Sequence, residues 1–231
     1  MIADPRRHSL IYVGDPLCSW CYGFALPLTA TLASWPHLRV DLVMGGLRAF
    51  NKEVMDGPMK DRLRHHWDEV HRRSGQVFTH QLLARRDFIY DTEPACRAVV
   101  TVREHAPEHA LAMHHAIQHA FYAEARDMTQ SALLASVWAQ LRSTLTEPPA
   151  LDEAAFTRLF ESPAMREMTR EDFALAQRWG IRAYPTLLAV VDGQATVVAN
   201  GYIDAAHLKA LVLQVFLQPE AGPGSDGTVA S

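Results

Sequence analysis

Two cysteines, Cys18 and Cys21, separated by a serine and a tryptophan, constrain this sequence more than any other feature. They follow an apolar run with strand character over residues 8–14 and a Gly-Asp-Pro turn signal at 14–16. A leucine-containing segment able to form a helix comes next. The unpaired N–H groups and the dipole at a helix N-terminus both favour thiolate over thiol. The pattern predicts a redox pair, with Cys18 at the exposed helix start and Cys21 one turn along the same face.

The same spacing occurs in half of a zinc site, which needs two further ligands, usually a second cysteine pair or a histidine pair. The chain has three cysteines, and Cys96 lies far from the other two in a helical context. We therefore favour redox use over metal binding, and expect Cys96 to be a buried helical residue rather than a third redox thiol. Three histidines, His114, His115 and His119, include a pair four residues apart. With 12 histidines spread through polar helices, we interpret them as a solvated helix face rather than a metal site.

Composition sets the general class. A chain of 231 residues can bury a good core, as one elaborated domain or two small ones. A net charge of −4 gives no reason to expect nucleic acid or an anionic membrane as a partner. No apolar run approaches the ~20 residues that span a bilayer. Residues 1–9 lack the apolar segment of ~7–15 residues found in signal peptides. The chain also has few cysteines, whereas secreted proteins stabilised by disulfides have more. Both features predict a cytoplasmic protein.

The first and last parts of the chain alternate between strand and helix patterns. Residues 8–14 and 38–44 read as strands on either side of a helix at 18–35, which makes a βαβ unit. Near the other end, two β-branched runs flank Asp192-Gly193, a hairpin signal, and an amphipathic helix follows at 205–217.

The middle of the chain has helical spacing and many charges. A helix is predicted from Pro58, a second begins at Thr92 as N-cap, a third restarts at Pro107, and a fourth opens at Thr129 or Ser131. Two further helices are predicted at 152–161 and 169–180, the latter with Thr169 as N-cap and Asp172 at the third position after it.

These elements assemble into an α/β fold, a thioredoxin-like βαβ–ββα core with an inserted all-helical domain. The core is assigned to residues 8–50 and 165–218, the insertion to 55–164, and residues 219–231, rich in Gly, Pro and Ser, are expected to be disordered.

This order of elements resembles the DsbA family of the thioredoxin superfamily. The resemblance is carried by Asp-Pro-Leu-Cys-Ser-Trp-Cys-Tyr-Gly at 15–23 and Ala-Tyr-Pro-Thr at 183–186, and it covers about residues 8–217. Within the family, the cysteine string looks most like the cytoplasmic FrnE-like branch, described as predicted dithiol–disulfide isomerases. The related 2-hydroxychromene-2-carboxylate isomerases and kappa-class glutathione transferases share the architecture.

The resemblance implies roles for several residues outside the cysteine pair. Pro185 matches the family's cis proline beside the active-site disulfide, which would turn the backbone of Tyr184 towards the cysteines and shape a substrate groove together with Thr186. Trp20 has two equal interpretations: an exposed apolar platform for client peptides, or a residue that packs against the helical insertion.

The function predicted is thiol–disulfide exchange on protein or small-molecule thiols and disulfides. Cys18 would attack a substrate disulfide and Cys21 would resolve the mixed disulfide, with no cofactor and with glutathione or thioredoxin as a possible recycling partner. No histidine lies between the cysteines, so we expect a more reducing couple than that of the strongly oxidising relatives.

Two alternative functions stay open at this point. The first is a glutathione-dependent isomerase or transferase, although such relatives generally carry serine at the first cysteine position and lack the second cysteine. The other is a non-enzymatic module, either a thiol metal buffer that uses Cys18 and Cys21 or a polypeptide-binding chaperone that uses the groove.

Overall fold

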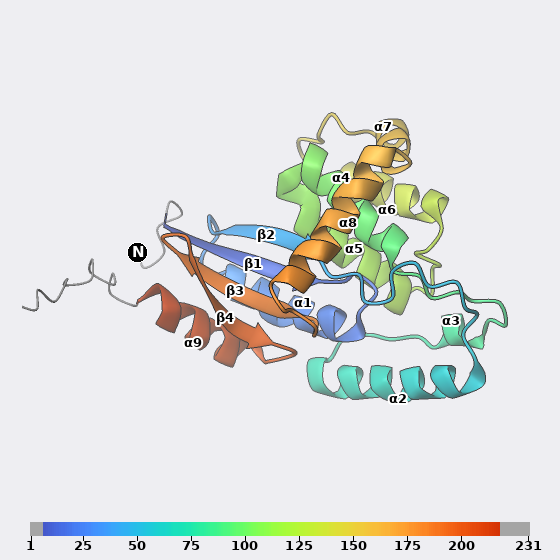
Figure 1. Ribbon diagram of the computed structural model, residues 1–231, viewed down its shortest axis with the longest axis horizontal. Coiled ribbons are helices and arrows are strands. Elements are labelled where there is room, and N and C mark those ends of the chain that lie inside the picture. The colour runs from blue at the N-terminus through green and yellow to red at the C-terminus, as the bar shows by residue number, and fades with distance from the viewer. Residues whose placement is uncertain (1–6, 218–231) are drawn as a thin grey trace, which may run out of the picture.

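A four-stranded mixed sheet forms the centre of the computed structural model, which describes residues 7–217 (Figure 1). The strand order is β2-β1-β3-β4. The strands are β1 (His8–Gly14), β2 (Arg39–Met44), β3 (Thr186–Val191) and β4 (Gln194–Asn200). β1 pairs in parallel with β2 through the crossover helix α1 (Ser19–Leu32), and β3 runs antiparallel to both β1 and β4.

Alternating side chains on the strands bury both faces of the sheet. Leu10 and Tyr12 of β1 belong to the main core, on the face covered by α1 and α9 (Ala205–Phe216). Val13 points the other way and packs with Ala176 of α8 (Pro163–Arg178), which crosses the opposite face in Figure 1. Successive side chains of a strand point to opposite faces of the sheet, so the apolar residues of β1 pack against helices on both faces.

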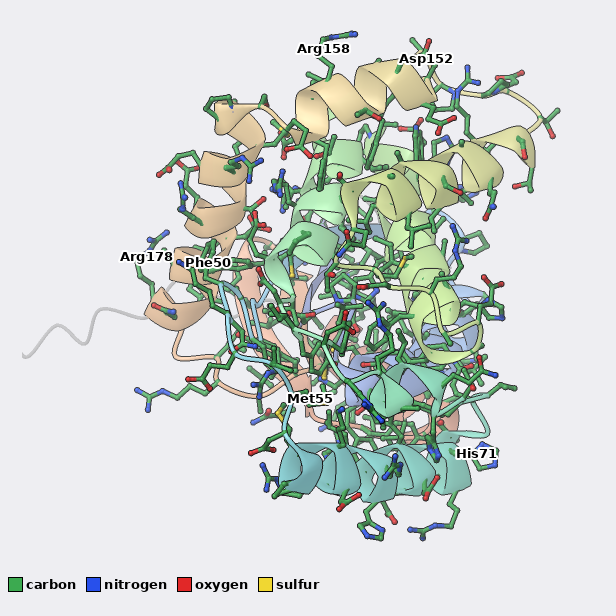
Figure 2. The ribbon with its side chains drawn as sticks, turned by 90° about the vertical axis from the view of Figure 1, so that its right-hand side faces the viewer. Phe50, Met55, His71, Asp152, Arg158 and Arg178 are labelled. Carbon is green, nitrogen blue, oxygen red and sulfur yellow. The ribbon has the colours of Figure 1, made fainter. Side chains whose placement is uncertain are left out.

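The remaining helices lie at one side of the sheet. They are α2 (Gly57–Ser74), α3 (Gln81–Ala84), α4 (Glu93–His105), a 3-10 turn (Pro107–His109), α5 (Ala110–Tyr122), α6 (Ser131–Ser143) and α7 (Glu153–Phe160). Figures 1 and 2 show α2 and α7 at opposite ends of this helical part, with Met55 just before α2 and Asp152 just before α7. Trp67 and Val70 bury one side of α2 against the core.

The predicted fold class is confirmed: an α/β thioredoxin-like fold with an inserted helical part. The strand at 8–14, the hairpin at Asp192-Gly193 and the helix from residue 205 are present. The assigned domain limits stay a prediction, and α8 runs across the limit between residues 164 and 165. The tail at 219–231 lies outside the described residues.

The predicted start of a helix at Thr169 was wrong, because α8 begins at Pro163 and its N-cap is Ser162. The Ser162 hydroxyl accepts from the amide of Met165 at 3.3 Å, which satisfies one of the free N–H groups of the first turn. Thr169 lies buried inside the helix and donates to the Met165 carbonyl at 2.7 Å. The Thr169–Asp172 pattern is typical of a helix start, but here it lies inside a longer helix.

Asp172 joins three elements instead of stabilising a helix start. Its carboxylate accepts from the backbone amide of Met44 in β2 at 2.8 Å and pairs with Arg103 of α4 at 2.6 Å. Arg103 also donates to the carbonyl of Leu42 at 2.8 Å. These bonds hold α8 and α4 against the end of β2. The loop that follows β2 begins at this point.

Candidate active site

Cys18 and Cys21 occupy the start of α1, directly after the end of β1. Cys18 is the N-cap residue in an extended conformation, and its amide donates to the Asp15 carbonyl at 3.0 Å. Both cysteines are free thiols and both are buried, although Cys18 retains 5% of its surface and Cys21 none. The two side chains lie close enough that Cys18 helps to raise the pKa of the Cys21 thiol. The structure therefore brings the predicted pair together, with Cys18 as the more accessible member.

The segment before β3 lies against Cys18. The Tyr184–Pro185 bond is cis, as predicted, and the Tyr184 carbonyl accepts from the Cys18 thiol at 3.7 Å. The Tyr184 hydroxyl donates to the carbonyl of Gly45 at 2.7 Å, which holds the ring beside the loop after β2. Thr186 begins β3 and donates to the Ala183 carbonyl at 2.8 Å. Tyr184 therefore lies against the first cysteine, and the use of Tyr184, Pro185 and Thr186 as a substrate groove stays a prediction.

Trp20 packs against the helical part, as one of its two interpretations proposed. Its half-buried ring lies 5.6 Å from His66 and 5.8 Å from Tyr202, measured between ring centroids. The guanidinium of Arg73 lies over the same ring at 5.2 Å from its centroid. His66 and Arg73 both belong to α2. Use of Trp20 as a platform for client peptides stays a prediction.

Asp15 organises the floor of the site, a role that the sequence analysis missed. Its fully buried carboxylate accepts from the amides of Leu17 at 2.8 Å and Leu47 at 2.7 Å. The Cys96 thiol donates to it at 3.4 Å, and the Thr92 hydroxyl is a fourth partner. Burial raises the pKa of Asp15, and the bonds from Thr92, Leu17 and Leu47 oppose that shift. One side chain thereby connects the cysteine loop, the loop after β2, and α4.

The partners of Asp15 settle two earlier predictions. Cys96 is buried in a helix, as expected. Thr92 is the residue before α4, but its side chain does not cap that helix. Its hydroxyl is committed to Asp15 and also accepts from the Arg48 amide at 3.1 Å. The one sequence signal for Asp15 is that an aspartate before Pro-Leu can bond the amide two residues on, in an Asx turn.

Tyr12 lies beneath Cys21 and is a second residue that sequence reasoning did not single out. Burial is the main reason that the pKa of the Cys21 thiol is raised well above its usual value, and the bond and charge of Cys18 act in the same direction. A hydrogen bond with the Tyr12 hydroxyl opposes this rise. Burial also raises the pKa of Tyr12, so the phenol keeps its proton near neutrality.

His114 does not lie on a solvated helix face, so that prediction was wrong for this residue. Its ring is fully buried and meets the Tyr12 ring edge-on at 5.4 Å between centroids. Burial lowers the pKa of His114, which keeps the imidazole neutral. The physical reason is that α5 packs against α1 and β2, so one side of its histidine-rich stretch faces the core. His119, further along α5, is exposed.

Neither a metal site nor a membrane helix is seen in the described residues. Within residues 7–217, no three His, Cys, Asp or Glu side chains are grouped closely enough to hold a metal ion. None of the helices in that range is both long and apolar enough to cross a membrane.

Replacement of Gly45 by alanine is expected to disturb the site from the loop side. A Cβ at this position would overlap the Tyr184 ring, so the ring must move and its bond to the Gly45 carbonyl must weaken. We expect a loss of about 1–3 kcal/mol in the free energy of unfolding, measured by urea denaturation. Gly57→Ala is the matched control, because a Cβ there meets nothing within 4 Å. Equal stability of the two variants would contradict the argument.

The sheet order, the cysteine pair at the start of α1 and the cis proline opposite it define a thioredoxin-fold protein of the dithiol type. The sequence matches the model of the DSBA-like thioredoxin domain over residues 10–211, and the chain belongs to this family. Among curated protein sequences, none matches this chain.

Solved structures support the same assignment. A proposed protein disulfide isomerase from Nitrosomonas europaea is 32% identical, with a TM-score of 0.81 over 91% of this chain and 98% of the other. The cytosolic disulfide reductase DsbM from Pseudomonas aeruginosa, in a structure with GSH, is 25% identical, with a TM-score of 0.67 over 90% and 98% of the two chains. A 2-hydroxychromene-2-carboxylate isomerase shares the fold at 15% identity, with a TM-score of 0.59 over 89% and 92%.

Proposed function

We propose that this protein is a cytoplasmic thiol–disulfide oxidoreductase or isomerase that acts through Cys18 and Cys21. The observation that carries the proposal is the pair of free thiols within the first turn of α1, with Cys18 as the more accessible member beside the Tyr184 carbonyl. The family is that of the DSBA-like thioredoxin domain, and two structural relatives are described as a proposed protein disulfide isomerase and a cytosolic disulfide reductase. The cytoplasmic location rests on the latter.

The proposed exchange has two steps. The Cys18 thiolate attacks one sulfur of a substrate disulfide, which forms a Cys18–substrate disulfide and releases the other sulfur as a thiolate. Cys21 then loses its proton and attacks the Cys18 sulfur, which releases the second substrate thiolate and leaves a Cys18–Cys21 disulfide. The substrate gains two electrons and the cysteine pair loses them. The reverse sequence oxidises a substrate dithiol.

The groove beside Cys18 is proposed to hold the substrate in an extended conformation. Tyr184 and Pro185 present backbone next to the first cysteine, and Thr186 continues into β3. Backbone pairing with such a segment binds peptides of varied sequence, because the hydrogen bonds do not depend on side chains. Trp20 would form the wall of the groove on the α2 side.

Glutathione is the recycling partner that the relatives favour, because DsbM has been solved with GSH. Two glutathione molecules would reduce the Cys18–Cys21 disulfide in two successive exchanges and become glutathione disulfide. The reaction needs no resident cofactor, since the cysteine pair itself carries the electrons. Thioredoxin could perform the same reduction.

The equilibrium of the Cys18–Cys21 couple in glutathione buffers tests this function, with Trp20 fluorescence or thiol alkylation as the readout. We expect a reduction potential near the cytosolic glutathione poise of about −220 to −260 mV, well below the about −120 mV of the strongly oxidising relative DsbA. The reason is the absence of a positive charge between the cysteines. A potential close to that of DsbA would instead indicate a disulfide donor. If no disulfide forms, the dithiol function is wrong.

A further inference from the structure

Arg73 carries a positive charge beside Trp20, the residue before Cys21, and has no acidic partner among residues 7–217. Its guanidinium lies 5.2 Å from the centroids of both the Trp20 and the Tyr202 rings. Among the residues that the structure describes, no carboxylate forms an ion pair with it. The nearby acids are already bound, because Glu69 pairs with Arg72 and Asp204 pairs with His207. The charge of Arg73 is therefore available to a ligand.

This arginine sits where the two sides of the cysteine site meet. Trp20 lies between Cys18 and Cys21 in the sequence. Tyr202 follows Gly201, whose amide donates to the Pro185 carbonyl at 2.7 Å. The Tyr202 hydroxyl in turn donates to the Arg73 carbonyl at 2.9 Å, which fixes the end of α2 on the cis-proline side. Arg73 thus contacts the start of α1 through Trp20, and it also contacts Tyr202, the residue after the one that bonds to Pro185.

The stacking prepares the guanidinium for one kind of ligand. A guanidinium placed against aromatic faces keeps the N–H groups along its edge free, and that planar fork matches both oxygens of a carboxylate. The aromatic rings also restrict the side chain before binding, which reduces the entropy lost when a ligand is bound. Arg72, the next residue, has no ring beneath it and already holds Glu69.

We propose that Arg73, held between Trp20 and Tyr202, is a carboxylate-binding subsite that selects anionic disulfides for reaction at Cys18. This inference rests on the proposed function and names its substrate class. The carboxylate can belong to a small disulfide such as glutathione disulfide or to an acidic residue near a peptide disulfide. Arg73 is a specificity residue and takes no part in the exchange of sulfur bonds.

The test compares anionic and neutral disulfides with Arg73→Gln and the matched control Arg64→Gln, which removes an arginine earlier in α2 whose ion pair is with Asp61. For glutathione disulfide we expect Arg73→Gln to raise KM about tenfold with kcat retained, since one charge-assisted hydrogen-bonded contact is lost. For the neutral 2-hydroxyethyl disulfide, KM should change less than about twofold. Arg64→Gln should leave both values unchanged. Salt should raise the wild-type KM for glutathione disulfide and have much less effect on Arg73→Gln.

The two sources of the carboxylate are separated by a peptide disulfide with either Glu or Gln beside its cysteine. A wild-type preference for the Glu peptide that Arg73→Gln abolishes supports acidic peptides as substrates, and an effect confined to glutathione disulfide supports the small disulfide. Equal losses on anionic and neutral substrates would overturn the subsite and assign Arg73 to packing. No loss on any anionic substrate would also overturn it.

Wild-type turnover of the neutral disulfide tests the proposed function separately. A wild type that is inactive on every disulfide would overturn both the proposed function and the subsite.

Discussion

Replacement of Cys21 by serine is expected to trap the protein as a mixed disulfide through Cys18. The substrate disulfide can still be attacked, but the buried thiol that would release the second half is gone. An intramolecular thiol in contact with Cys18 acts at a very high effective concentration, so multiple turnover should fall by roughly 100-fold or more. Intact-protein mass spectrometry after addition of glutathione disulfide would show one bound glutathione.

Cys96→Ser is the control for loss of a cysteine, because serine can keep the hydrogen bond to Asp15. It should form no lasting mixed disulfide and should retain turnover. If Cys21→Ser turned over as fast as the wild type, the dithiol mechanism would be wrong and a glutathione-dependent isomerase or transferase would fit better.

The same step has a defined pH dependence in the wild type. Burial raises the pKa of Cys21, so near neutrality this thiol is protonated and only its small thiolate fraction can attack. Below its pKa, that fraction grows tenfold for each unit of pH. Single-turnover release of the second substrate thiol should therefore accelerate throughout the accessible pH range.

Removal of the Glu93 side chain is expected to give the largest loss of stability. Glu93 and Arg97 form a buried ion pair within α4, at 2.8 Å between Nε and Oε1. Arg97 also donates to the Phe160 carbonyl at 2.6 Å and lies 3.9 Å from the centroid of the Phe160 ring. In Glu93→Ala, the buried guanidinium loses its buried carboxylate and keeps only the longer contact of 3.7 Å with the exposed Glu161. We expect the free energy of unfolding to fall by about 3–5 kcal/mol, measured by urea denaturation.

Two further variants show whether the unpaired charge is the cause. Glu167→Ala removes an exposed partner of Arg170 and should cost less than about 0.5 kcal/mol. The double variant Glu93→Leu with Arg97→Met removes both charges and should recover much of the loss. A Glu93→Ala variant as stable as Glu167→Ala would contradict the argument.

The sequence predicted what depends on local pattern. The period of the strand at 8–14, the hairpin at Asp192-Gly193 and the cysteine pair before a helix are short-range signals, and each is confirmed in the structure. The position of Pro185 came from the family resemblance, and its cis bond is present.

The sequence could not show which polar groups the core would enclose. Asp15 reads as a turn residue, yet its carboxylate joins three segments because α4 packs over it. Thr92 sits at the expected helix start, but Asp15 and Arg48 compete successfully for its hydroxyl. His114 resembles its exposed neighbours in sequence and is buried because of how α5 packs. In each case tertiary contacts override a local preference.

The long-range contacts of Asp15 and Cys18 determine when the site can form during synthesis of the chain. The bond between Asp15 and Cys96 joins residues 81 apart in the sequence, and the contact between Cys18 and Tyr184 joins residues 166 apart. Contacts of such separation close large loops, which costs chain entropy and slows folding. Both cysteines leave the ribosome long before Tyr184 has been synthesised. The redox site can therefore be completed only after residue 184 has been made, and until then both thiols lack the segment that covers them.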